Sequence, residues 1–180
     1  EKGLIKDFHV FRCGDDLEMV IYHDLGAGSP VLHEFLWDTI RACRAVAVEL
    51  KLHTSAEGDL GGAFAGSLKS LGPGIAEMEF SLRESEPVVI LMVNKTLTGP
   101  FNLPLYKIFA DPFNTAGLIL DPLMFSGFSF TVADLKTGRV ITLSTPHESH
   151  QLLALIGSTS RYVVQAVYRN LASEICAAIS

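Results

Sequence analysis

Residues 8–23 read FHVFRCGDDLEMVIYH, and this stretch sets the expected fold class. It contains two alternating runs, 8–13 and 17–23, on either side of a short polar segment at 14–16. Two strand-like runs joined by so short a polar turn predict a β-hairpin. We therefore expect the chain to open with an antiparallel pair of strands.

The next stretch, residues 29–52, reads SPVLHEFLWDTIRACRAVAVELKL. Ser29 suits the N-cap of a helix and Pro30 its first helical position, so a helix should begin here and end near Leu52. Its apolar residues recur at three- and four-residue spacing, which places them on one face: Leu32, Leu36, Ile40, Cys43, Ala47 and Leu50.

Further along the chain, strand-like segments outnumber helical ones. Residues 54–74 are rich in glycine and predict a long loop. The longest apolar stretch, 87–93, has the length of a buried strand. The other expected elements are strands at 76–82, 88–93, 161–169 and 175–179, a hairpin of 127–135 with 140–144, and helices at 105–110 and 150–156.

This order of elements predicts an α/β (α+β) fold. With 48% hydrophobic and 19% charged residues, the 180-residue chain can bury a sizeable core. Neither an internal repeat nor a linker is visible, so we expect residues 1–180 to form a single domain.

Charge and cysteine usage exclude several classes of function. A net charge of −6 argues against nucleic acid or an anionic membrane as the main partner. No apolar run reaches the roughly 18 residues that a membrane span needs. Cys13, Cys43 and Cys176 lack CxxC spacing, so structural zinc and a disulfide framework are not expected. That pattern predicts a reduced, cytoplasmic location.

Three features allow both a functional and a plain structural interpretation. Adjacent carboxylates at Asp15 and Asp16 would suit a divalent metal, although Gly-Asp-Asp is also good chemistry for a solvated turn. The glycine-rich segment could bind phosphate through backbone N–H groups, or simply connect two elements. Asn94 and Lys95 follow an expected strand and could reach a ligand, or Lys95 could extend into solvent.

Residues 102–122 read NLPLYKIFADPFNTAGLILDP. This run resembles the signature of the archaeal-type (class V) fructose 1,6-bisphosphate aldolase/phosphatase family. Further matches run along the chain at residues 14–16, 71–79, 85–87, 152–157, 161–163 and 167–169. The resemblance implies a layered α-β-β-α sandwich, incomplete here at both ends, and a homo-octamer.

The same resemblance implies a chemistry. Members of that family are gluconeogenic enzymes with several Mg²⁺ ions. They condense two triose phosphates through a lysine Schiff base and then hydrolyse the 1-phosphate of fructose 1,6-bisphosphate. By position, the implied metal ligands are Asp15, Asp16, Glu57 and Asn94. The implied substrate contacts are His53, Gly66, Ser67 and Lys95.

The departures from the family pattern matter equally. Glu57 stands where the family has glutamine, Asn94 where it has aspartate, His53 where it has tyrosine, and Gly58 where it has an acid. No lysine here matches the Schiff-base position, so aldolase activity is not expected of this chain. Glu57 could restore the ligand charge that Asn94 removes.

Three hypotheses follow for function. The chain could be a Mg²⁺-dependent fructose 1,6-bisphosphatase, a decayed or truncated paralogue that binds sugar phosphates or assembles with partners, or part of a longer enzyme. If the protein is this short, we expect oligomerisation to cover the surface that an incomplete sheet exposes.

Overall fold

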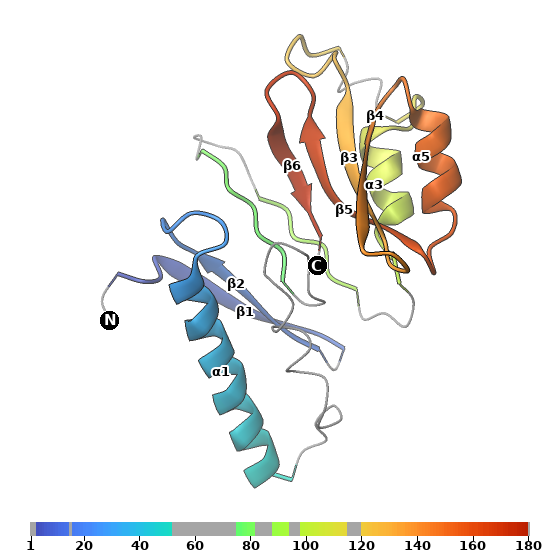
Figure 1. Cartoon of the computed structure of the whole chain (residues 1–180). Helices are drawn as coiled ribbons and strands as arrows, with labels where there is room; N and C mark the ends of the chain where they lie inside the picture. Colours follow the sequence, from blue (N-terminus) through green and yellow to red (C-terminus); the bar gives the residue numbers. More distant parts are fainter. Residues whose placement is uncertain are drawn as a thin grey trace. The chain divides into compact units, whose positions relative to one another are not determined.

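The computed structural model describes residues 3–14, 16–51, 75–81, 88–93, 98–114 and 120–179, without the side chain of Asp16 (Figure 1). Within these residues the elements are, in order, β1 (Asp7–Cys13), β2 (Asp16–Tyr22), α1 (Pro30–Glu49), α3 (Asn102–Phe109), β3 (Phe128–Asp134), β4 (Arg139–Ser144), α5 (Ser149–Ile156), β5 (Tyr162–Arg169) and β6 (Glu174–Ala178). The chain divides into two compact units, mainly 1–12 with 17–77, and 13–16 with 78–179. Each is described by itself.

The first unit contains the expected hairpin. Strands β1 and β2 pair in a two-stranded sheet, and a two-residue loop joins them. Gly14 opens that loop with φ 64°, a left-handed conformation that glycine adopts without steric cost. At the open end, the Lys6 backbone N–H donates to the Tyr22 carbonyl oxygen at 2.8 Å. The predicted hairpin is confirmed, with bounds shifted by one residue.

Helix α1 begins at Pro30, as predicted, and ends at Glu49. Ser29 occupies the N-cap, but its side chain makes no capping hydrogen bond among the described residues. The predicted apolar face is buried only near its start, since Leu32 is 2% exposed and Leu50 61%. An apolar stripe is buried only where another element packs on it.

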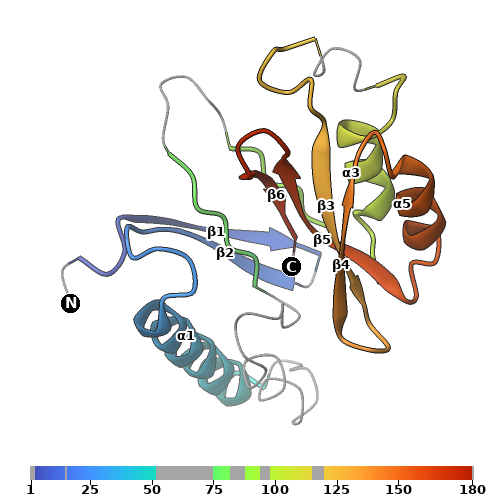
Figure 2. The same ribbon diagram turned by 45° about the horizontal axis from the view of Figure 1, so that its top comes forward.

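The second unit is a four-stranded sheet with helices on one face (Figures 1 and 2). Its strand order is β4-β3-β5-β6, and every neighbouring pair is antiparallel. Both α3 and α5 pack on β5, and α5 also packs on β4. These findings confirm a mixed helix and antiparallel-sheet fold, the α+β class. The layered sandwich and the single domain remain predictions.

The core of the second unit is built from alternate residues of a strand and from residues one turn apart on a helix. Alternate residues of β3, Phe128, Phe130 and Val132, are each at most 1% exposed. On α5, Leu152 and Ile156 lie one helical turn apart and are both buried. Burying each such side chain stabilises the fold by about 1.5–3 kcal/mol. The core therefore fastens α5 to the sheet.

Two predicted strands are not present. Neither 76–81 nor 88–93, the described parts of those predictions, forms a strand. The expectation of a buried strand at 87–93 is also wrong for its described part, since Val88, Val89 and Leu91 are 59%, 75% and 57% exposed. The described residues supply neither a hydrogen-bonded neighbour nor a covering layer for this apolar segment, and a buried strand needs both.

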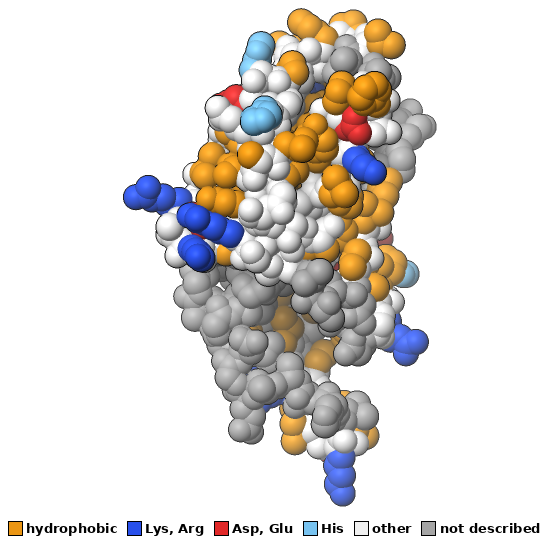
Figure 3. Space-filling view, turned by 90° about the vertical axis from the view of Figure 1, so that its right-hand side faces the viewer, with side chains coloured by type: hydrophobic (Ala, Val, Ile, Leu, Met, Phe, Trp, Pro, Cys, Tyr) orange, Lys and Arg blue, Asp and Glu red, His pale blue; other side chains and the backbone are white. Residues whose placement is uncertain are grey.

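Apolar side chains are also exposed elsewhere. Figure 3 shows several groups of them on the face of the molecule that it presents. In the second unit, Leu103 is 59% exposed and Leu153 47%. Among the described residues no helix has both the length and the apolar character to cross a membrane. The predicted glycine-rich loop at 54–74 lies outside the described residues.

Candidate functional site

The paired carboxylates lie at the β1–β2 turn. Strand β1 ends at Cys13 and β2 begins at Asp16, so Gly14 and Asp15 form the connection between the two strands. Asp15 and the side chain of Asp16 lie outside the described residues. The backbone agrees with the predicted turn, and a metal-binding role for the two carboxylates stays a prediction.

The other predicted site residues, His53, Glu57, Gly66, Ser67, Asn94 and Lys95, also lie outside the described residues. Their nearest described neighbours are Lys51, with a left-handed φ of 54°, and Val93, which is 43% exposed. The predicted grouping of these residues with Asp15 and Asp16 therefore remains a prediction.

One partly buried polar cluster was not predicted from the sequence. His33 on α1 is 4% exposed, and its Nε2 lies 2.5 Å from Oε1 of Glu77. The second oxygen of that carboxylate, Oε2, accepts a hydrogen bond from the Gly28 N–H at 2.8 Å. We call these three residues the Glu77 anchor. No motif or spacing marks it, because His33 and Glu77 lie 44 positions apart.

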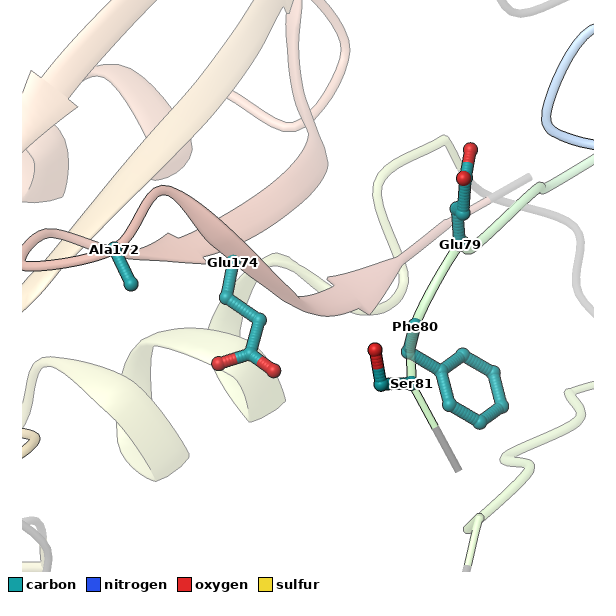
Figure 4. Close-up of a pocket in the computed structure, with 5 residues that line it drawn as sticks. All are labelled: Glu79, Phe80, Ser81, Ala172 and Glu174. Carbon is teal, nitrogen blue, oxygen red and sulfur yellow. The ribbon is translucent and has the colours of Figure 1, made fainter. Parts of the chain in front are cut away.

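A surface pocket opens in the second unit (Figure 4). It has a volume of about 470 Å³ and is lined by Glu79, Phe80, Ser81, Ala172 and Glu174. In Figure 4 the two glutamate carboxylates point apart, and Glu174 forms an ion pair with Arg169 at 2.5 Å. Carboxylates that point apart do not form a metal site, and their negative charge does not suit a phosphate ligand.

In the part of the chain that the structure describes, no group of three or more His, Cys, Asp and Glu side chains could hold a metal ion. The predicted ligand set lies outside the described residues.

The signature run begins with a structural residue. Asn102 is 2% exposed. Its Nδ2 donates to the carbonyl oxygens of Ile156 at 3.1 Å and Tyr162 at 2.8 Å. Its Oδ1 accepts from the Val164 N–H at 2.9 Å. One side chain thus satisfies two buried backbone groups and a partly buried one, and it ties α3 to α5 and β5.

Lys107 stands in the last turn of α3 and is exposed. A cation there interacts favourably with the negative end of the helix dipole.

The ion pair between Arg161 and Asp134 is also structural. Arg161 donates two hydrogen bonds to Asp134 at the end of β3. These bonds lower the pKa of Asp134 below its usual range, against the opposing effect of its burial, and the Lys136 N–H adds to the lowering. The same pairing raises the pKa of Arg161. Because both groups stay charged at neutral pH, this pair holds β3 to the start of β5.

Comparison with known proteins extends the argument beyond the described residues. A family model described as fructose-1,6-bisphosphatase matches residues 1–180. Several relatives carry the name fructose-1,6-bisphosphate aldolase/phosphatase. The one from Sulfurisphaera tokodaii is 44% identical over 180 residues, which is 100% of this chain and 47% of the relative. The one from Thermococcus kodakarensis is 49% identical over 168 residues, 93% of this chain and 45% of the relative.

A third relative of the same name, from Methanothermobacter marburgensis, is 42% identical over all of this chain and 49% of its own length. The chain thus spans about half the length of the curated relatives it matches. Since the family model covers every residue of the chain, the chain belongs to the fructose-1,6-bisphosphatase family.

Proposed function

We propose that this chain takes part in the Mg²⁺-dependent hydrolysis of the 1-phosphate of fructose 1,6-bisphosphate. The observation that carries the proposal is the match of its whole length to a fructose-1,6-bisphosphatase family model. The hairpin supports it, because a two-residue loop between β1 and β2 brings Asp15 and Asp16 to one end of the sheet.

The proposed metal ligands are Asp15, Asp16, Glu57 and Asn94. All four offer oxygen atoms, and three are carboxylates, which is the donor set that Mg²⁺ prefers. Bound there, Mg²⁺ would polarise the phosphoryl oxygens and lower the pKa of an attacking water. Asp15 and Asp16 need such a positive charge beside them, because adjacent carboxylates repel each other.

The remaining site residues would bind and orient the substrate. Lys95 offers a positive charge to a phosphate group. Gly66 allows close approach of the backbone, and Ser67 offers a hydroxyl that can donate to a phosphate or sugar oxygen. His53 can donate or accept a hydrogen bond at a sugar hydroxyl. These assignments rest on the positions that the family resemblance implies.

Aldolase activity is not part of the proposal, since no residue of this chain matches the Schiff-base lysine. Triose phosphates would then be ligands rather than reactants. We also propose a cytoplasmic homo-oligomer. The exposed apolar residues at 88–93 support self-association, because apolar surface of this kind is normally covered in an assembly.

The test is phosphate release from fructose 1,6-bisphosphate by the chain, with and without Mg²⁺. Its controls are the double revertant Glu57→Gln/Asn94→Asp and the double variant Asp15→Asn/Asp16→Asn. The proposal expects Mg²⁺-dependent release by the parent chain and a loss of at least about 100-fold in the aspartate variant.

Two other outcomes would contradict hydrolysis by this chain. Release by the revertant alone would mean that the changed ligands abolished activity, and the chain would then be a sugar-phosphate-binding or assembly protein. If neither the parent chain nor the revertant released phosphate, catalysis would depend on residues that these 180 do not contain.

A further inference from the structure

We draw no further inference here: the strongest candidate, the surface pocket of the second unit lined by Glu79, Phe80, Ser81, Ala172 and Glu174, rests on two carboxylates that point apart, and nothing among the described residues indicates what ligand it would hold.

Discussion

Arg161 donates two hydrogen bonds to Asp134, from Nε to Oδ1 at 3.0 Å and from Nη2 to Oδ2 at 2.8 Å. This geometry is bidentate, and the Asp134 side chain is only 7% exposed. The same carboxylate accepts from the Lys136 N–H in the β3–β4 turn. The Arg161–Asp134 pair therefore fixes both the β3–β4 turn and the start of β5.

The first prediction concerns acid stability. The pKa of Asp134 is lowered in the folded chain. Its carboxylate therefore contributes fully to the free energy of unfolding above the unfolded-state pKa of about 3.9, and this contribution is lost as the pH falls below that value. Asp134→Asn should therefore lower the free energy of unfolding at pH 7. Between pH 5 and pH 3 the variant should lose less stability than the parent chain.

Urea unfolding at the three pH values measures this difference. Asp38→Asn is the control, because Asp38 pairs with Arg41 on the exposed face of α1, with side chains 58% and 61% exposed. Such a surface pair contributes little. If the free energy of unfolding fell equally between pH 5 and pH 3 in the Asp134 variant and the parent chain, another group would be responsible for the loss of stability in acid.

The second prediction concerns Asn102. Asn102→Ala leaves two buried backbone groups and a partly buried one without this partner, so it should destabilise the chain by about 2–4 kcal/mol. Asn114→Ala should cost about 0.5 kcal/mol or less, because Asn114 is exposed and its side chain donates to Asp111 in an exposed hydrogen bond. Urea midpoints of the two variants give the comparison, and similar losses would refute a structural role specific to Asn102.

The third prediction uses two glycines with nearly the same backbone angle. Gly127 has φ 77° and Gly138 φ 68°. A Cβ at position 127 would lie 2.0 Å from the Thr145 carbonyl oxygen, whereas one at position 138 would meet nothing within 4 Å. Gly138→Ala should therefore cost only the left-handed conformation, about 1–2 kcal/mol.

Gly127→Ala should lower the free energy of unfolding more than Gly138→Ala does, because the added Cβ would also collide with the Thr145 carbonyl oxygen. Soluble yield and urea unfolding of both variants measure the difference. If the two substitutions had the same effect, backbone crowding at Gly127 would not be the reason for its glycine.

The fourth prediction concerns self-association. Val89→Lys/Leu91→Lys places charges on the exposed apolar segment, so it should reduce the size of the assembly without lowering the free energy of unfolding. Sedimentation velocity measures the size. Leu171→Lys is the control, since Leu171 is 58% exposed and lies elsewhere in the chain. A parent chain that sediments as a monomer would contradict the proposed oligomer.

Local patterns predicted the elements whose signals are local. Turn chemistry at Lys136, Thr137 and Gly138 located the β3–β4 hairpin, and Gly138 has the positive φ that such a turn favours. The helix predicted at 150–156 corresponds to α5 (Ser149–Ile156), which buries Leu152 and Ile156.

The features that local patterns did not predict depend on contacts between residues that are distant in sequence. Residues 88–93 read as a buried strand because they are apolar, but composition does not say whether a neighbouring strand exists. His33 and Glu77 meet across 44 positions, and the amide of Asn102 reaches Ile156 across 54. Adjacency alone suggested Asp15 and Asp16 as metal ligands, whereas Glu57 and Asn94 were assigned that role by resemblance, since single Glu and Asn residues carry no periodic signal.

The antiparallel order β4-β3-β5-β6 has a consequence for folding kinetics. The β3–β4 and β5–β6 pairs each close over a short connection, so both have low contact order and should form early. Helix α3 is tied to α5 and to β5 by the Asn102 contacts, which span 54 to 62 positions. We therefore expect Asn102→Ala to accelerate unfolding and leave the folding rate nearly unchanged in stopped-flow experiments. The signature residue would then determine how long the second unit stays folded and not how quickly it folds.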